Sequence, residues 1–248
     1  MTLSTTAQLT PAFSDDFGGG KLDTHKWAIA TYQSPDSKPG INQGRYSTAN
    51  VDLQQGLLCI RVSQKVVDGE VQSSGGAIIS KDRFGFGTYE FEMRMSSTSP
   101  TPNGVGKPLT GAVSSGFLYY NKSETEIDLE FLGDQNRVWV TNWRNPDART
   151  APNVDDSRIK QTTKLLNKDF AAAFHTYTLV WEPERIRVFI DGALVTTHSQ
   201  NVPQVPAYII LEHRGTNSGT WGGTATVGRD RYFYVRSVKF TPFPEKNK

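Results

Sequence analysis

The stretch ETEIDLEFLG, residues 124–133, places an acidic residue at every second position. Successive side chains of a β-strand point to opposite faces, so this alternation predicts a strand with one apolar face and one acidic face. The apolar face would carry Ile127, Leu129 and Phe131 and pack into a core. The acidic face would carry Glu124, Glu126, Asp128 and Glu130.

Alternating or continuously apolar runs recur along the chain, separated by turn residues, and each predicts a strand. These runs cover residues 56–64, 76–81, 87–95, 111–120, 125–133, 137–143, 175–183, 185–190, 193–199, 207–213 and 232–240. Asp191-Gly192 predicts a type I′ turn between two of the strands. A short helix is predicted only within residues 164–174. The polar segments 96–111 and 144–164 are predicted to be long loops, of the kind that often serve a function.

The strand pattern predicts an all-β fold, a jelly-roll β-sandwich of two antiparallel sheets. A chain of 248 residues is within the range of one undivided sandwich, and no linker or internal repeat interrupts it. We therefore expect a single domain over residues 1–248, with residues 1–12 as a loose N-terminal segment.

Composition excludes several classes of protein. The formal net charge of +2 is too small, and the basic residues too dispersed, to indicate a nucleic-acid partner. No run approaches the roughly 18 apolar residues of a membrane span. The N-terminus lacks the basic and apolar regions of a secretory signal. Cys59 is predicted to be a small buried hydrophobe. No histidine or cysteine spacing indicates a metal, so we expect no metal and no cofactor, and we expect a monomer.

The acidic face has a spacing suited to glycosidic bond cleavage. The Cα atoms of Glu126 and Glu130 would lie about 13 Å apart, four steps of about 3.3 Å. Side chains leaning together would bring the carboxyl groups toward the roughly 5–5.5 Å of a retaining glycosidase. Asp128 lies between them, and three carboxylates so close cannot all ionise cheaply. One of them would hold a proton, which a general acid needs.

Three other interpretations compete with catalysis. A solvated sheet face is the commonest fate of alternating acidic residues, although neighbouring like charges destabilise a strand. A calcium site has the right oxygen ligands, but a strand cannot fold its side chains round one ion. A lectin-like module would bind sugar without cleaving it.

The same residues carry a family resemblance. Glu126-Ile-Asp128-Leu-Glu130 forms E-x-D-x-E and is followed by FLG, which resembles the signature of glycoside hydrolase family 16. Further similar segments are FSDDFGGGKLDTHKW (13–27), RFGFGTYEFEMRM (83–95), GAVSSGFLYY (111–120) and FHTYTLVWEPERIRVFIDGALV (174–195). The resemblance implies a concanavalin-like jelly roll with the substrate lying across one sheet. It also implies that Glu126 is the nucleophile, Glu130 the general acid/base, and Asp128 a residue that tunes the pair.

Candidate substrate-binding residues come from the residue pattern and from the resemblance together. Trp139 and Trp143 alternate with core valines, so they would face the cleft and stack on sugar rings; core packing is the alternative. By resemblance the set continues with Phe117, Tyr119, Glu212, Arg214, Trp221, Tyr46 and Asn42.

Several positions depart from the family pattern. Ala77 and Ile79 stand where lichenases have glutamate and arginine, Tyr46 where a tryptophan is usual, and Arg236 where an aspartate binds structural calcium in many members. The resemblance therefore implies calcium only weakly here. Arg214 replaces a stacking tryptophan; it would either pair with Glu212 or recognise an acidic polymer.

Taken together, the sequence predicts a retaining endo-glycosidase that hydrolyses internal β-glycosidic bonds of a polysaccharide, either a β-glucan or a related polymer, neutral or acidic. The alternatives are a transglycosylase acting on the same class of substrate and a non-catalytic carbohydrate-binding module. Such a polymer places the expected site of action outside the cell, in the periplasm or at the cell wall, with any leader absent from this chain.

Overall fold

The computed structural model describes residues 11–145, 159–166 and 168–244. Within them, regular structure is β-strand apart from one 3₁₀ turn, η1 (Thr48–Asn50). The front sheet contains β11 (Ile159–Leu165), β10 (Arg137–Trp143), β9 (Thr125–Leu132), β8 (Ala112–Tyr120), β15 (Ala207–Gly215) and β6 (Glu70–Phe84), paired in that order, with β2 (Trp27–Ile29) also on β6. The back sheet contains β5 (Leu57–Val67), β16 (Arg231–Pro242), β7 (Gly87–Ser97), β12 (His175–Glu182), β13 (Arg185–Ile190) and β14 (Ala193–His198), with β1 (Phe13–Asp15) on β16 and β4 (Val51–Gln54) on β5.

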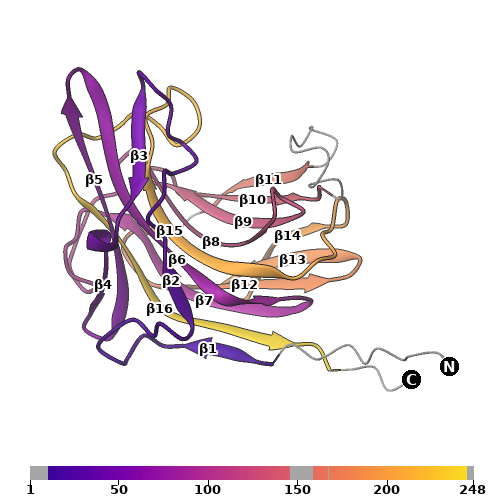
Figure 1. Cartoon of the computed structure of the whole chain (residues 1–248). Helices are drawn as coiled ribbons and strands as arrows, with labels where there is room; N and C mark the ends of the chain where they lie inside the picture. Colours follow the sequence, from indigo (N-terminus) through magenta and orange to yellow (C-terminus); the bar gives the residue numbers. More distant parts are fainter. Residues whose placement is uncertain (1–10, 146–158, 167, 245–248) are drawn as a thin grey trace.

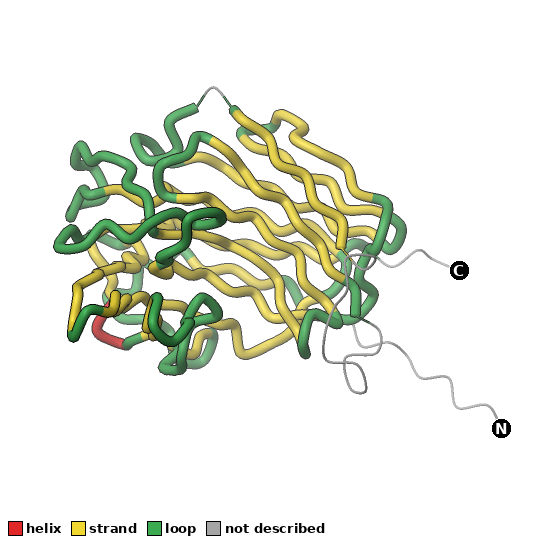
Figure 2. The backbone as a smooth tube through the Cα atoms, turned by 90° about the horizontal axis from the view of Figure 1, so that it is seen from above, coloured by secondary structure: helices red, strands yellow, loops and turns green. Residues whose placement is uncertain are grey.

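The two sheets form two layers joined along one edge. Figure 1 shows β8 to β11 lying above β7, β12 and β16. The joint is the antiparallel pairing of β5 with β6, on which β3 (Asn42–Tyr46) pairs in parallel. Seen from above, the strands run side by side and most of the loops gather at one end (Figure 2). The all-β jelly-roll prediction is confirmed, and each of the eleven predicted strands overlaps an observed one.

Two glycines allow β6 to pass from the joint into the front sheet. A Cβ atom on Gly75 would lie 2.4 Å from the carbonyl oxygen of His213, closer than real contacts allow. At Gly76 a Cβ atom would lie 2.8 Å from a methyl group of Ile60. Only glycine fits backbones that approach so closely, and this approach sets β15 beside β6.

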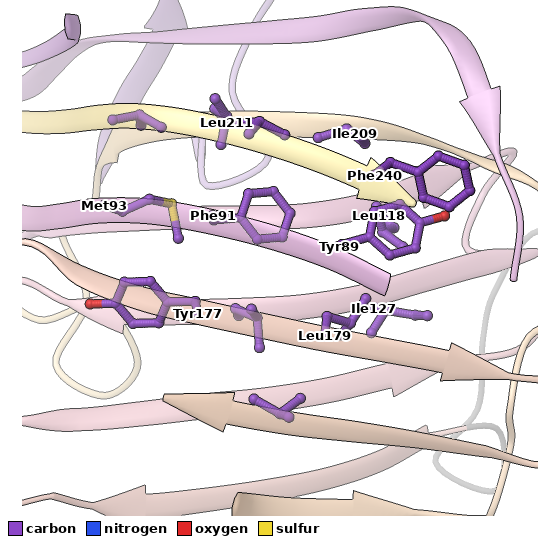
Figure 3. Packing of buried hydrophobic residues seen from close by; sticks show 14 of the residues in the cluster. Tyr89, Phe91, Met93, Leu118, Ile127, Tyr177, Leu179, Ile209, Leu211 and Phe240 are labelled. Carbon is purple, nitrogen blue, oxygen red and sulfur yellow. The ribbon is translucent and has the colours of Figure 1, made fainter. Parts of the chain in front are cut away.

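The core lies between the layers. Its side chains are the inward-facing members of strands from both sheets, as the alternation predicts. Figure 3 shows part of this cluster, with Leu118, Ile127, Ile209 and Leu211 from the front sheet and Tyr89, Phe91, Met93, Tyr177, Leu179 and Phe240 from the back sheet. Ile127 and Leu129 are each 1% exposed, so the apolar face of β9 is buried as predicted. Burial of that face fixes the direction of the acidic face.

Two predictions from the sequence are wrong. No helix forms among the described residues of 164–174. Instead, the side chain of Asp169 accepts hydrogen bonds from the amides of Ala171 (3.0 Å) and Ala172 (3.1 Å), which closes a turn. The predicted loop 144–164 contains part of strand β11, which pairs with β10 from Arg137 to Trp143. Its polar composition hides it, because β10 supplies the backbone partners that an edge strand needs. The rest of that loop, residues 146–158, lies outside the described residues.

Other local predictions can be followed in the structure. Asp191 and Gly192 have φ values of 49° and 77°, as a type I′ turn requires. Cys59 is buried, and burial raises the pKa of its thiol to about 12. Most of the predicted N-terminal segment, residues 1–10, lies outside the described residues. Among those described, no helix is long and apolar enough to cross a membrane.

Candidate active site

Three carboxylates of β9 share the outer face of the front sheet with matched residues of its neighbours. Three rows cross the sheet, and each row begins on β10 and continues through β9 and β8 to β15. The rows are Trp143–Glu126–Tyr119–Tyr208, Thr141–Asp128–Phe117–Ile210 and Trp139–Glu130–Ser115–Glu212. Glu124 is not in the strand; it precedes β9 in a turn and accepts a hydrogen bond from Asn121 Nδ2 (2.7 Å). The prediction of four carboxylates on one strand face is therefore wrong for Glu124.

These carboxylates line a cavity of about 380 Å³. Its lining residues are Tyr32, Pro35, Tyr46, Phe117, Tyr119, Ser123, Glu126, Asp128, Glu130, Ile210, Glu212 and Arg214. A larger hollow of about 680 Å³ lies over β3, β5 and β6, but its lining is serine, glutamine, glycine, lysine and arginine without a carboxylate. The smaller cavity therefore combines carboxyl groups with aromatic rings, which the larger hollow does not.

Burial makes all three carboxyl groups hold protons more tightly than usual. It raises the pKa of Glu126 to about 7, and the nearby charge of Glu130 adds to the rise. It raises the pKa of Asp128 well above the usual range, with contributions from Glu126 and Glu130. Burial also raises the pKa of Glu130, although Arg214 opposes that rise. Burial is the largest cause for each group, and the close spacing of the carboxyl groups adds to it for Glu126 and Asp128.

Glu126 is held by the turn that precedes its strand. Asn121, Lys122 and Ser123 have φ values of 44°, 51° and 62°, the left-handed region that non-glycine residues rarely adopt. This conformation brings Ser123 Oγ to Glu126, and the hydroxyl donates a hydrogen bond to Oε2. The bond lowers the pKa of Glu126 against the larger effect of burial. Strained backbone of this kind is common where a functional side chain is positioned.

Asp128 is fixed from the neighbouring strand. Trp143 Nε1 donates a hydrogen bond of 3.2 Å to Asp128 Oδ2. Asp128 is 5% exposed, and the indole ring of Trp143 lies beside it on the β10 side. Trp143 thus contacts a carboxylate of the site, in addition to lying on the outer face of the sheet.

Arg214 joins three carboxylates from three parts of the chain. Its Nε donates to Asp36 Oδ2 (2.5 Å), its Nη2 donates to Glu130 Oε1 (3.2 Å), and its Nη1 pairs with Glu212. The guanidinium lies 5.0 Å from the ring of Trp221. The pairing with Glu212 that the sequence left open is therefore present, together with two pairings that the sequence did not predict.

Glu212 is itself a buried hydrogen-bond acceptor. Tyr46 Oη donates to Glu212 Oε2 (2.6 Å) and Ser115 Oγ donates to Oε1 (3.2 Å). With 2% exposure and three partners, this carboxylate fixes Arg214 and Tyr46 in place.

The predicted substrate-binding residues divide into three groups. Phe117, Tyr119, Tyr46, Glu212 and Arg214 line the cavity. Trp139 and Trp143 extend the carboxylate rows on β10, and Trp221 lies against Arg214. Asn42 is 1% exposed, and its amide bonds to Asp36 O, Gly215 O and Ser73 Oγ, so it does not reach the cavity.

Sequence reasoning missed several residues that line the cavity or hold its charges, among them Ile210 on β15. Tyr32, Pro35 and Asp36 come from a loop that carries no chemical pattern, and only the fold brings it to β15. Ser123 could have been found from the sequence, because it lies three residues before Glu126 in the preceding turn.

Arg236, the position that bears on calcium in the sequence, lies in β16. Arg236 pairs with Glu92 and lies 4.1 Å from the ring of Phe174 on the back sheet. Among the described residues, no group of three or more histidine, cysteine, aspartate or glutamate side chains is arranged to hold a metal ion.

Comparison with known proteins gives one family. The sequence pattern described as "Glycosyl hydrolases family 16" matches residues 41–232. A beta-glucanase of Paenibacillus polymyxa is 31% identical over 174 residues, 67% of this chain and 63% of that protein. A beta-glucanase of Bacillus subtilis (strain 168) is 30% identical over 168 residues, 65% of this chain and 61% of that protein. The aligned part of the chain thus spans less than two thirds of these relatives.

Longer similarities agree with these. The endo-1,3-1,4-beta-glycanase ExoK of Rhizobium meliloti (strain 1021) is 27% identical over 243 residues, 93% of this chain and 78% of that protein. Among solved structures, the Bacillus licheniformis beta-glucanase matches with a TM-score of 0.75 at 23% identity, covering 95% of this chain and 100% of its own. The Thermotoga maritima MSB8 laminarinase catalytic domain matches with a TM-score of 0.73 at 18% identity, covering 96% and 99%. At such identities the structures show a shared fold.

Proposed function

The chain belongs to the glycosyl hydrolases of family 16, and on that premise we propose that it is a retaining endo-glycosidase acting on a β-linked glucan. The observation that carries the proposal is that Glu126, Asp128 and Glu130 lie on one face of β9 and line one cavity. The pKa values of all three carboxyl groups are raised there. A retaining glycosidase needs two carboxyl groups close together and one transferable proton.

In the proposed reaction Glu126 attacks the anomeric carbon while Glu130 gives its proton to the leaving oxygen. The glycosidic bond breaks and a covalent glycosyl-enzyme forms on Glu126. Glu130, now ionised, takes a proton from water, which attacks the anomeric carbon and releases Glu126. Both steps use protein carboxyl groups and water, so the proposal includes no cofactor.

Asp128 would keep the charge of this trio low. Burial and its two neighbours raise the pKa of Asp128 well above the usual range, which favours its protonated form. A neutral Asp128 removes one of three negative charges from a confined space. We therefore assign Glu126 as nucleophile and Glu130 as acid/base on the family resemblance. We assign Asp128 as the residue that keeps the negative charge beside both glutamates low.

The aromatic residues favour sugar as the substrate. Phe117 and Tyr119 flank Asp128 and Glu126 in the register, and Trp139 and Trp143 flank Glu130 and Glu126 on the other side. Rings on both sides of the carboxylates suit stacking on successive sugar units. The related proteins are described as beta-glucanases, and β-glucan is our proposed substrate class. A polymer of this size is met outside the cytoplasm, where we place the activity.

The test is incubation with a panel of neutral and anionic β-linked polysaccharides. We expect a mixture of oligosaccharides by mass spectrometry, because internal bonds are cut. Proton NMR of the first product should show the same anomer as the substrate linkage. Initial release of the opposite anomer would exclude the proposed mechanism.

The panel also separates the rival functions. Longer chains formed from labelled acceptor sugars would identify a transglycosylase using the same two glutamates. Binding of a polysaccharide without any cleavage, in a correctly folded protein, would identify a carbohydrate-binding module.

A further inference from the structure

The proposed acid/base has to carry a proton in one step and lose it in the next. Glu130 must be protonated when the glycosidic bond breaks and ionised when water attacks. The charges that surround its carboxyl group decide how readily it changes state. The inference below rests on the proposed function for this role, and on the contacts of Glu130 for everything else.

Arg214 is the cation that touches Glu130. The two side chains are 10% and 15% exposed and are joined by the hydrogen bond from Nη2 to Oε1 (3.2 Å). An arginine this close favours the ionised carboxylate and opposes the proton that a general acid needs. Alone, Arg214 would therefore favour only the second step.

Asp36 takes a share of the same guanidinium. Its carboxylate accepts from Arg214 Nε at 2.5 Å, and its side chain is 25% exposed. Asp36 acts on Glu130 in the opposite sense to Arg214, because its negative charge raises the pKa that the arginine lowers. Glu130 thus receives only part of the arginine's charge.

The side chain of Asn42 ties together the backbone segments that carry this pair. Asn42 Nδ2 donates to Asp36 O (3.2 Å) and to Gly215 O (3.3 Å), the residue that follows Arg214. One buried amide therefore bridges the loop that carries Asp36 to the end of β15, and Ser73 fixes its oxygen (2.7 Å). These bonds fix the backbone at Asp36 and at Gly215. The backbone on both sides therefore sets the distance between the Asp36 carboxylate and the Arg214 guanidinium.

We propose that Asp36 and Arg214 form a latch between the 31–41 loop and β15 that positions the acid/base Glu130 and sets its readiness to exchange a proton. In this latch both are positioning residues, acting on the reaction through Glu130. The other groups that face Glu130 are Glu126 and Asp128 on β9, Glu212 on β15 and Tyr46 on β3. The latch adds a carboxylate from a separate loop to that set.

The latch predicts opposite effects of its two members. Asp36→Asn should move the alkaline limb of kcat/KM to lower pH, because Glu130 then feels more of the arginine's charge. Arg214→Gln should move the same limb to higher pH. About one pH unit is expected in each direction, the lower end of what a neighbouring charge produces. Arg214→Lys keeps the charge without the planar fork and should give a smaller shift than Arg214→Gln.

Carboxyl carbon NMR supplies a readout that needs no turnover. In protein labelled at the glutamate carboxyl carbon, the Glu130 signal is identified by its loss in Glu130→Gln. Its midpoint should fall in Asp36→Asn and rise in Arg214→Gln. If the protein cleaves no glycan but these midpoints move, the latch stands and the proposed function fails.

A remote surface pair provides the control. Asp230 and Arg61 lie 3.5 Å apart, so Asp230→Asn and Arg61→Gln repeat the two chemical changes away from the cavity and should leave the Glu130 midpoint in place. Thermal unfolding shows whether each variant folds; if Arg214→Gln does not, Asp36→Asn and Arg214→Lys decide. Midpoints that stay fixed, or that move in the same direction in Asp36→Asn and Arg214→Gln, would overturn the latch.

Discussion

At the scale of single residues, burial and pairing have opposite effects on the pKa values of the carboxyl groups in the site. Burial raises the pKa of Glu126, Asp128 and Glu130, while Ser123 and Arg214 pull the pKa of particular members down. In the proposed reaction these opposing effects would give three similar carboxyl groups different roles. Separating the pKa values of neighbouring carboxyl groups is a general way to obtain an acid and a base from one residue type.

Substitution of the two glutamates tests the proposed roles. Glu126→Gln and Glu130→Gln should each lower turnover on polysaccharide by on the order of a thousandfold, with the fold kept, because each removes one chemical step. Added azide should restore turnover of Glu130→Gln on aryl glycosides with good leaving groups, where no proton donor is needed. Any azide product formed by Glu126→Gln should have the inverted anomeric configuration, because azide would then attack the substrate directly, whereas the product of Glu130→Gln should keep the configuration of the substrate. Near-normal turnover in either variant would contradict the assignment.

Ser123 gives a second prediction at this scale. Its hydroxyl stabilises ionised Glu126, so Ser123→Ala should raise the pKa of Glu126 further and move the acidic limb of kcat/KM to higher pH. We expect about one pH unit, since a hydrogen bond to a charged group is worth about 1.5 kcal/mol and one pKa unit about 1.4 kcal/mol.

Ser123→Gly separates the hydroxyl from the backbone. Ser123 has a φ of 62°, which glycine adopts more easily than alanine. Both variants lose the hydroxyl, so equal shifts in the two would assign the effect to the hydrogen bond. A shift in Ser123→Ala alone would assign it to the turn.

At the scale of elements, β9 depends on the strands beside it. Its apolar face alone determines which side is outward, but its neighbours β8 and β10 determine what surrounds the carboxylates. β10 in turn is tied to the end of β14 through His198. The ring is 1% exposed, with Nδ1 2.7 Å from Asn142 Oδ1 and Nε2 2.7 Å from Thr162 Oγ1 of β11.

His198 predicts a pH dependence of stability. Burial, with a smaller effect of Lys160, lowers the pKa of His198 from 6.5 to about 4. The unfolded chain therefore binds the proton first, and stability falls as pH falls from about 6.5 toward 4. Between pH 7 and pH 5 this costs about 2 kcal/mol, at about 1.4 kcal/mol per pH unit below 6.5.

Urea unfolding of the wild type and His198→Gln measures the effect. The stability advantage of the wild type over the variant should shrink by that amount between pH 7 and pH 5, because glutamine does not titrate. The exposed His25 gives the matched control, His25→Gln. An advantage of constant size across this range would show that His198 does not bind a proton on unfolding.

At the scale of the whole molecule, the sandwich assembles the cavity from distant parts of the chain. Asp36, Glu130 and Arg214 meet although they are far apart in sequence, because β15 lies between β6 and β8. The long strands β5 and β6 pair with each other at the joint between the layers, and β3 pairs with β6 there. These pairings bring the 31–41 loop, which precedes β3, onto the front sheet. The back sheet contributes core side chains that support this face without lining the cavity.

The sequence alone predicted the β-class, the main strands and the three carboxylates of β9. These follow from the period of side-chain alternation, which is a local property of the chain. The prediction of a helix within residues 164–174 was wrong, because the side chain of Asp169 closes a turn among the described residues there. Strand β11 was missed because a polar edge strand is specified by its partner β10.

Only the tertiary structure decided what the carboxylates touch. Arg214 was open to two interpretations until Asp36 and Glu130 appeared beside it, and no local pattern marks Asp36. Asn42, a predicted substrate-binding residue, is not among the residues that line the cavity, and its amide donates to the backbone carbonyl of Asp36. Alternation fixes which face of a strand a side chain occupies, whereas charge pairing across a cavity depends on strand order and loop placement. Those depend on contacts between residues remote in sequence, which the local pattern does not contain.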